Sequence, residues 1–242
     1  MIVLGIDTTT EVLNLAIIKN SVMSFEFMMK REGMTHSANL IPTLQNMLKL
    51  TEVKLNELEG IAVSIGPGSF TGLRIGLATA KGLAFSLSIP IAGVNALQSY
   101  AQRWKELPGI LCPLIRARKE KYYFAFYKKS KNSDDLIRIE DYQCMDWFAI
   151  KKKLFKFDKP VFIFGYGLTE IIENNETNKY PNNINFIIRK QEPPGALNIA
   201  LIGEKKILKK ENDNIYDLSP FYIRKSAAEV KKEEIQNNIF NK

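Results

Sequence analysis

The residues with the clearest chemical potential form a glycine-rich string between a strand pattern and a helix pattern. The string reads Gly66-Pro67-Gly68-Ser69-Phe70-Thr71-Gly72-Leu73-Arg74-Ile75-Gly76. Backbone N–H groups at a helix start have no intrahelical partner, so such a loop can bind a phosphate. It is not a P-loop, because no Lys-Ser or Lys-Thr pair follows Gly72. We expect Gly66, Gly68 and Ser69 to bind nucleotide or phosphate. The alternative is a tight turn in which Ser69 or Thr71 caps the helix.

A second polar group follows the first apolar run of the chain. Asp7, Thr8 and Thr9 come directly after Ile2–Ile6, a run typical of a central strand. An Asp can hold Mg²⁺ through water, and hydroxyl and amide groups at such a turn can hold phosphate. The alternative is an Asx or Ser/Thr turn between two strands. The three residues are therefore further candidates for nucleotide or phosphate binding.

The histidine and cysteine counts exclude several classes of enzyme. The chain has one His, His36, and two Cys, Cys112 and Cys144. A His-x-x-x-His metal pair cannot exist, and any Ser-His-Asp set would depend on His36 alone. Two Cys cannot form a disulfide framework or a four-ligand metal site. We therefore predict no catalytic residue and no metal site.

The sequence predicts a cytoplasmic protein with no membrane association. No apolar run reaches the ~18 residues needed to cross a bilayer. The apolar start Met1–Ile6 has no basic region and meets Asp7 too early for a signal peptide. Two scattered, free cysteines fit a reducing compartment.

Charge is distributed unevenly along the chain, whose formal net charge is +8. Residues 1–105 carry 9 basic and 7 acidic side chains, whereas residues 106–242 carry 25 and 19. Basic clusters at 116–121, 151–159 and 205–210 could follow a phosphate backbone. Lys outnumbers Arg 26 to 8 and Asn is abundant, which also fits an AT-rich genome and a solvated surface. Both interpretations remain open.

Hydrophobic patterns predict two halves with one order of elements. In the first half we expect strands at 2–6, 13–18 and 24–29, a helix around 40–48, a strand at 58–65, a helix at 69–86, a strand at 89–94 and a helix at 96–104. In the second half we expect strands at 110–117, 122–129 and 136–144, a helix at 148–154, a strand at 161–164, a helix at 168–174, a strand at 184–188 and a helix at 194–207. A meander followed by alternating helices and strands gives an α/β fold with mixed sheets flanked by helices. We predict two subdomains, 1–105 and 106–242.

Small residues recur along the helix that follows the glycine-rich string. Gly72, Gly76, Ala80 and Ala84 are spaced by four residues, although each helical Gly costs ~1 kcal/mol relative to Ala. This ridge either packs closely inside the domain or forms the seam of a helix–helix dimer. In the second case the seam continues along an apolar stripe of the preceding helix, made of Leu40, Ile41, Leu44, Met47 and Leu48.

Several of these motifs resemble those of the TsaB (YeaZ) family. The resemblance rests mainly on Gly66–Gly76 with Ala78–Leu83, and also on Ile6–Glu11, the His36-Ser37 helix start, Ile89–Val94 and the tail Leu218–Glu229. It is dense in the first half and thin in the second. It implies the actin/Hsp70-like ATPase (ASKHA) fold, built from two ribonuclease-H-like subdomains. The first would carry the partner-binding helices, and the second would be smaller and divergent.

The resemblance also implies a function. Family members are noncatalytic subunits that pair with the catalytic subunit TsaD and are joined by TsaE. The assembly transfers threonylcarbamoyl to N6 of the adenosine 3′ to the anticodon of tRNAs reading ANN codons, and isolated members form homodimers through the TsaD-binding helices. The implied interface comprises His36, Leu40, Ile41, Leu44, Met47, Leu48, Gly72, Arg74, Gly76, Ala80 and Ala84. We expect no stably bound cofactor, ATP or ADP with Mg²⁺ only at the level of the complex, and tRNA contact through the assembled complex.

One position departs from the family pattern. Members carry Asp-Ala-Arg at the first strand of the second half, where this chain has Arg116-Ala117-Arg118, so nucleotide hydrolysis by this chain alone is less expected. TsaD uses a His-x-x-x-His pair as metal ligands, which a chain with only His36 cannot reproduce. The alternative function is an ATP-dependent small-molecule kinase of the same superfamily, for which Asp7 is the one available catalytic Asp. A peptidase would need a nucleophile that the sequence does not offer.

Overall fold

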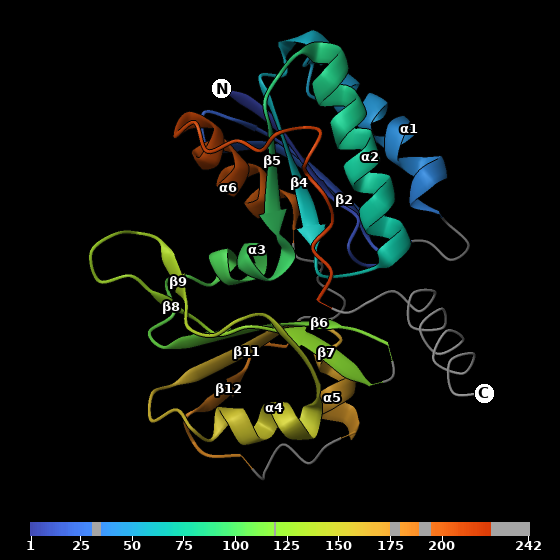
Figure 1. The fold of residues 1–242 in the computed structure, drawn as a ribbon. Coiled ribbons are helices and arrows are strands. Elements are labelled where there is room, and N and C mark those ends of the chain that lie inside the picture. The colour runs from blue at the N-terminus through green and yellow to red at the C-terminus, as the bar shows by residue number, and fades with distance from the viewer. Residues whose placement is uncertain (31–34, 119, 175–179, 189–194, 224–242) are drawn as a thin grey trace, which may run out of the picture.

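A computed structural model describes residues 1–30, 35–118, 120–174, 180–188 and 195–223. Two β-sheets, one in each half of the chain, lie on either side of helix α3 (Ala96–Arg103), as Figure 1 shows. Among these residues, no helix combines the length and the apolar character that crossing a bilayer requires.

The first sheet has the strand order β3-β2-β1-β4-β5. The first three strands form an antiparallel meander, and β4 and β5 run parallel to β1. The elements are β1 (Ile2–Asp7), β2 (Leu13–Lys19), β3 (Val22–Met29), α1 (His36–Leu50), η1 (Leu55–Glu57), β4 (Gly60–Gly66), α2 (Phe70–Leu87) and β5 (Ile91–Asn95). The predicted meander and the alternation that follows it are confirmed, and this is the strand order of a ribonuclease-H-like half.

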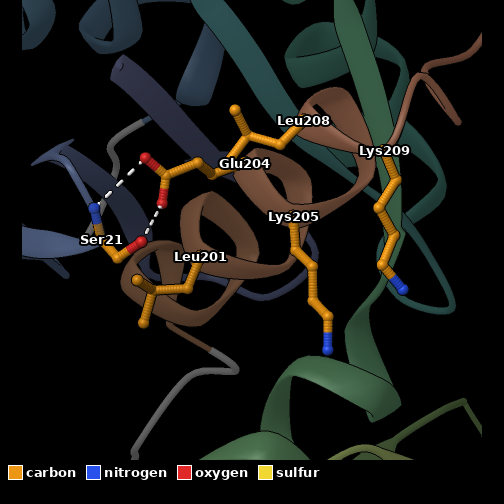
Figure 2. A pocket seen from close by; sticks show the side chains of 6 residues that line it. All are labelled: Ser21, Leu201, Glu204, Lys205, Leu208 and Lys209. Atoms are coloured by element: carbon orange, nitrogen blue, oxygen red, sulfur yellow. Dashed lines mark hydrogen bonds between the residues drawn. The ribbon is translucent and has the colours of Figure 1, made fainter.

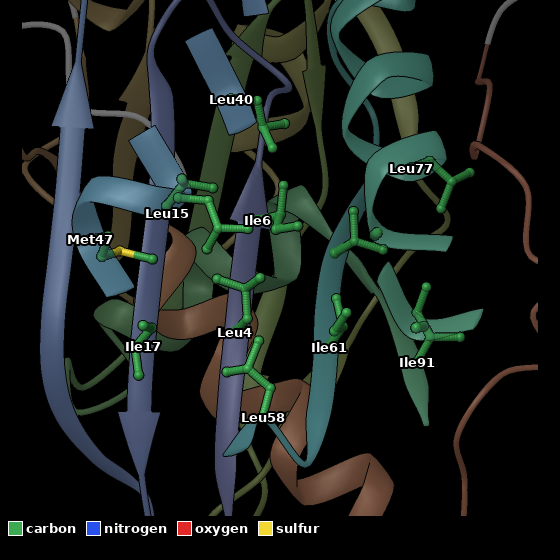
Figure 3. Packing of buried hydrophobic residues seen from close by; sticks show 14 of the residues in the cluster. Leu4, Ile6, Leu15, Ile17, Leu40, Met47, Leu58, Ile61, Leu77 and Ile91 are labelled. Carbon is green, nitrogen blue, oxygen red and sulfur yellow. The ribbon is translucent and has the colours of Figure 1, made fainter. Parts of the chain in front are cut away.

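Strand β1 is buried on both faces because helices cover both sides of the first sheet. Leu4 and Ile6 point toward α1 and α2 and pack with residues such as Leu40 and Leu77 (Figure 3). Val3 points to the opposite face, where it packs against α6 (Ala196–Leu208). Alternate residues of a strand face opposite sides of its sheet, so two covered faces require a continuous apolar run.

The second sheet repeats this order as β10-β7-β6-β11-β12, with β8 and β9 off the main path. Strand β6 pairs antiparallel with β7 and parallel with β11, just as β1 pairs with β2 and β4. The elements are β6 (Ile110–Arg116), β7 (Lys121–Phe124), β8 (Tyr127–Lys129), β9 (Leu136–Arg138), β10 (Gln143–Asp146), α4 (Trp147–Leu154), β11 (Val161–Tyr166), α5 (Leu168–Asn174) and β12 (Ile184–Phe186). The two halves therefore share one architecture, as predicted.

Two segments predicted as continuous strands are each divided. The segment 122–129 forms β7 and β8, and the segment 136–144 forms β9 and the start of β10. The chain changes partner at Ala125-Phe126, because β7 pairs with β10 whereas β8 pairs with β9. Both of these side chains are buried, so the apolar pattern continues through the break between β7 and β8. Hydrophobic periodicity therefore could not indicate that break.

The last helix returns to the first half of the chain. Helix α6 covers the face of the first sheet opposite α1 and α2, and α3 lies between it and the second sheet (Figure 1). The approach is close, since a Cβ at Gly203 would lie 2.3 Å from the Cβ of Ala62. The division of the chain at residue 105 stays a prediction. Helix α6 belongs to the segment 106–242 but packs on the first sheet, which the segment 1–105 forms.

A buried carboxylate fastens α6 to the β2–β3 turn. The two oxygens of Glu204 accept hydrogen bonds from the Ser21 backbone N–H at 3.2 Å and the Ser21 hydroxyl at 2.6 Å (Figure 2). Asn20 and Ser21 both have positive φ, as a two-residue type I′ hairpin turn requires. A 320 Å³ pocket lies beside this contact. Because both carboxylate oxygens are used within the chain, this contact is structural.

The chain after α6 forms a strap across the first half, which we call the C-terminal strap (residues 209–223). The Asp213 N–H donates to the carbonyl of β5 residue Ile91 at 2.9 Å. Farther along, Lys81 of α2 donates to the Leu218 carbonyl at 3.1 Å, and the Leu218 side chain is buried in the core of the first half. The strap thereby holds α2 in place on the sheet. The remainder of the family-like tail, from Arg224, lies outside the described residues.

Candidate functional site

The β1–β2 turn and the start of α2 lie against each other, as the predicted phosphate site requires. The Ser69 N–H donates to the Thr9 carbonyl at 2.7 Å, and the Thr8 hydroxyl donates to the Gly72 carbonyl at 2.7 Å. Thr8 and Thr9 are only 1% and 2% exposed. The structure thus brings the two predicted loops together, but the loops bind each other.

The glycines of the string allow backbone to touch backbone. A Cβ at Gly68 would lie 2.4 Å from the Thr9 carbonyl oxygen, and a Cβ at Gly72 would lie 2.0 Å from the Thr8 carbonyl oxygen. At Gly76 a Cβ would lie 2.2 Å from the Thr8 hydroxyl. Only glycine permits contacts this short. A nucleotide phosphate therefore does not fit between these loops, and the expected role of ATP or ADP with Mg²⁺ stays a prediction about the complex.

Two backbone donors at the start of α2 are satisfied within the chain. The Ser69 hydroxyl accepts a hydrogen bond from the Gly72 N–H at 3.2 Å, so Ser69 caps the helix. The Ser69 N–H itself is used by Thr9. An anion site at a helix start needs free N–H groups, and these two are taken. The helix-cap alternative for Ser69 is confirmed.

The C-terminal strap closes over the same loop from the outside. The Phe221 N–H donates to the Ile65 carbonyl at 2.7 Å, just before Gly66. The Tyr222 ring stacks on Phe70 with 5.1 Å between the ring centroids. The Arg74 guanidinium lies 3.9 Å from the centroid of the Phe70 ring. The first turn of α2 is thus covered by an aromatic and cationic stack.

Asp7 is the most constrained polar residue of the site. Its Oδ1 accepts hydrogen bonds from the Thr9 N–H at 2.9 Å and the Thr9 hydroxyl at 2.6 Å, so the Asx-turn alternative is confirmed. Its Oδ2 has no hydrogen-bond partner among the described residues. Burial raises the pKa of the Asp7 carboxyl, while the bonds from Thr9, the charge of His36 and the Gly195 backbone lower it by less. A carboxyl in this setting braces a turn, and it is poorly placed to meet solvent-borne Mg²⁺.

The single histidine connects α1 to the same turn. His36 is the first residue of α1, and its Nε2 donates to the Thr10 carbonyl at 2.8 Å. Its ring also lies against α2, because a Cβ at Gly72 would be 3.3 Å from its Cδ2. The β1–β2 turn therefore fixes the starts of both helices of the α1–α2 pair.

The predicted partner interface is only partly on the surface. Its exposed or half-buried members are His36, Ile41, Leu48 and Arg74. The members buried in the core of this chain are Leu40, Leu44, Met47, Gly72, Gly76, Ala80 and Ala84. The small-residue ridge Gly72–Ala84 therefore packs inside the domain, which agrees with the close-packing alternative. Other residues form the exposed side of the helix. The exposed side of α2 carries Ala78, Gly82 and Phe85, and a Cβ at Gly82 would meet no atom within 4 Å.

The strand end that leads into the equivalent turn of the second half is exposed and charged. Arg116 ends β6 and forms an ion pair with Glu170 of α5, with both side chains more than two-fifths exposed. Across the boundary between the halves, the Tyr166 hydroxyl donates to the Glu11 carboxylate at 3.2 Å, and Lys30 pairs with the same carboxylate at 2.9 Å. Lys30 is the main cause of the lowered pKa of Glu11. In the described part of the chain, no three His, Cys, Asp or Glu side chains gather as a metal site would require.

Sequence reasoning missed two buried polar side chains beside Asp7. Asn14 on β2 is paired with Asp7 in register, and its Oδ1 accepts a hydrogen bond from the Ala196 N–H at the start of α6. Ser64 on β4 is the next residue after the partner of Ile6. The Asn14 Nδ2 and Ser64 Oγ have no hydrogen-bond partner among the described residues. A polar residue inside an otherwise apolar strand pattern is the signal that would have found both.

Comparisons with known proteins agree on one family. The family model of TsaD, described as tRNA N6-adenosine threonylcarbamoyltransferase, matches residues 30–232. The tRNA threonylcarbamoyladenosine biosynthesis protein TsaB of Bacillus subtilis (strain 168) is 29% identical over 98% of this chain and 100% of its own length. The protein of that name from Escherichia coli (strain K12) is 33% identical over 54% of this chain and 57% of its own. The solved structure of YeaZ from Pseudomonas aeruginosa has a TM-score of 0.73 at 21% identity, covering 92% of this chain and 99% of that one, and confirms the fold.

Proposed function

The chain belongs to the TsaB (YeaZ) family within the wider TsaD family of tRNA N6-adenosine threonylcarbamoyltransferases, and we propose that it acts as a noncatalytic subunit of such a transferase. The assembly would transfer threonylcarbamoyl to N6 of the adenosine 3′ to the anticodon of tRNAs that read ANN codons. This chain would activate and hold a TsaD-type catalytic subunit in the cytoplasm.

The observation that carries this proposal is the interlocked pair of loops. In a nucleotide-using protein the two loops would face a phosphate, whereas here Ser69 and Thr8 bind the opposite loop. The sole histidine is used to fix α1 to the turn. The chain thus keeps the architecture of the family while its polar residues brace two helices. The kinase alternative loses support, because its one candidate Asp, Asp7, is buried in the turn.

The partner surface we propose is the exposed side of the α1–α2 pair. Ile41 is 42% exposed, and Ala78, Gly82 and Phe85 lie along the solvent side of α2. A glycine inside an exposed helix costs ~1 kcal/mol relative to Ala, so close approach by a partner would explain Gly82. A TsaD-type subunit would occupy this surface in the complex, and a second copy of this chain would occupy it in isolation. A TsaE-type protein, with ATP or ADP and Mg²⁺, would join at the level of the complex.

Co-purification with the TsaD homologue of the same organism tests the proposal. We expect a stable complex, and modification of tRNA in vitro only when both proteins are present. Gly82→Trp should weaken the complex at least ~10-fold, because a Cβ at Gly82 meets no atom of this chain within 4 Å and the indole would fill the partner surface. Asp141→Trp, at a residue whose side chain is 94% exposed in the second half, is the matched control and should bind normally.

Two results would contradict the proposal. Full tRNA modification by the TsaD homologue without this chain would remove the subunit role. Normal binding by folded Gly82→Trp protein would remove the α1–α2 surface while leaving the subunit role in place. Unfolding curves of both variants separate a lost interface from a lost fold.

A further inference from the structure

The second half carries a basic groove on elements other than the α1–α2 pair. The groove has a volume of 770 Å³ and lies between the β8–β9 hairpin and the segment that leads into β11. Four lysines line it, Lys128, Lys129, Lys131 and Lys159, against one acidic residue, Glu106. This excess of positive charge in a concave surface attracts a polyanion.

Ion pairs hold one wall of the groove in position. Lys129 binds Glu106 at 2.7 Å and Asp134 at 3.3 Å, and Lys105 binds Asp134 as well. These contacts fasten the β8–β9 hairpin to the loop between α3 and β6. Strand β8 is also paired with β6 through Tyr127 and Leu111, so the hairpin has a backbone contact besides the ion pairs. The charge of Lys129 is already paired with carboxylates of this chain.

The other three lysines remain available to a ligand. Lys128, Lys131 and Lys159 are exposed, and within the ranges that the structure describes none of them forms an ion pair. A Lys ammonium on a flexible stem binds phosphate as a point charge. Three such groups on opposite walls of one groove can contact successive phosphates of a nucleic-acid backbone.

Exposed aromatic rings on α4 and at its C-terminal end, which leads into the groove at Lys159, narrow the class of polyanion. Phe148 and Phe155 of the α4 region are 68% and 50% exposed. Lys152 lies 4.4 Å above the Phe148 ring, and Lys151 lies 6.0 Å from the centroid of the Phe155 ring. The segment from Phe155 leads directly to Lys159 in the groove. Exposed rings interleaved with lysines suit unstacked bases, whereas an acidic protein would gain only from the charges.

We propose that this groove and the neighbouring edge of α4 bind RNA, with the lysines on the phosphates and Phe155 under an unpaired base. The proposal rests on the proposed function, which supplies tRNA as the RNA in question. It assigns the contact to the second half, on elements other than the α1–α2 surface. One molecule can therefore hold a catalytic partner with its first half and the substrate with its second.

Fluorescence anisotropy of a labelled tRNA transcript tests the groove. The triple variant Lys128→Gln, Lys131→Gln, Lys159→Gln should weaken tRNA binding at least ~10-fold. It should also make the plot of log K against log salt concentration less steep by about 2, because each phosphate contact contributes ~0.7–0.9 to the magnitude of that slope. Phe155→Ala should weaken binding about fivefold or more without changing the slope, because the stacking that it removes is not electrostatic. Each measurement is made twice, once on the complex of this chain with its TsaD homologue and once on this chain alone.

The matched control carries the same change of net charge elsewhere. Lys19→Gln, Lys49→Gln, Lys54→Gln removes three exposed lysines from the first half, and it should change tRNA affinity less than twofold. Equal weakening by both triple variants would show a general charge effect and overturn the groove. Unchanged tRNA affinity of the groove variant would also overturn the proposal. If that variant keeps its tRNA affinity but no longer binds an acidic protein, the groove is a protein-binding site and the proposal is likewise overturned. Binding of the TsaD homologue, measured on the same variants, reports the proposed function separately.

Discussion

The two halves of the molecule have one strand order and opposite uses of the same turn. In the first half, the turn after β1 is buried and bonded to the starts of α1 and α2. In the second half, β6 ends in Arg116, just before the equivalent turn, and Arg116 pairs with Glu170 at the surface. The first turn supports a helical surface, whereas the second leaves its charged side chain in solvent. A duplicated fold can thus use one position to brace two helices in one copy and to present a charged side chain to solvent in the other.

The burial of the two turns explains this difference in use. Buried polar atoms need partners inside the protein, so Asp7, Thr8 and Thr9 lock the first turn into one geometry. Exposed ion pairs exchange readily with water and fix little. Substitutions that remove a hydrogen bond of the first turn or force a clash there should therefore cost stability, while substitutions at the end of β6 should cost little.

The largest effect is expected at Gly76. Gly76→Leu forces a Cβ to 2.2 Å from the Thr8 hydroxyl, so α2 must move away from the β1–β2 turn. We expect a loss of ~3 kcal/mol or more in the free energy of unfolding, measured by urea denaturation. Gly82→Leu in the same helix is the control, and it should not destabilise the protein, because its Cβ meets open space. Equal free energies of unfolding for the two variants would show that the close contact between Gly76 and the β1–β2 turn does not stabilise the fold.

Much of this fold could be predicted from the sequence because both sheets are built from apolar runs. The Gly72–Ala84 ridge faces inward together with Leu73 and Leu77, which are buried in the structure. Periodicity alone left the ridge open to either interpretation because a smooth surface suits a sheet as well as a partner. The return of α6 to the first sheet could not be predicted, because a helical pattern does not state which sheet its apolar face will cover.

A smaller effect is expected from the hydrogen bond of Thr8. Thr8→Val keeps the side-chain shape and removes the hydroxyl that donates to the Gly72 carbonyl at 2.7 Å. The loss should be about 1 kcal/mol, the usual contribution of a buried neutral hydrogen bond. Tyr166→Phe removes the matching cross-boundary bond to Glu11 in the open region, and it should cost less than ~0.5 kcal/mol in the same assay. Similar losses in the free energy of unfolding for both variants would show that a hydrogen bond in the buried turn is worth no more than one in the exposed region.

The Asp7 carboxyl should make stability depend on pH in a definite direction. Burial raises its pKa in the folded state, so the folded protein binds this proton more tightly than the unfolded chain does. Its contribution is present below the ordinary value of 3.8 and is lost as pH rises through the folded pKa. Asp7→Asn removes the buried charge and keeps an oxygen for Thr9. In urea denaturation the variant should gain stability over the native protein at pH 7, and that gain should shrink toward pH 4.

The smallest effect is expected at Arg116. Arg116→Gln removes the ion pair with Glu170, whose two side chains are largely in solvent, so unfolding should change by no more than ~0.5 kcal/mol. Even this difference should fade at 0.5 M salt, because exposed charges more than a few ångströms apart are then screened. A salt-independent loss of ~1.5 kcal/mol or more would show that the second turn is also a brace. In that case the two halves would differ in the residues they use and not in the task of the turn.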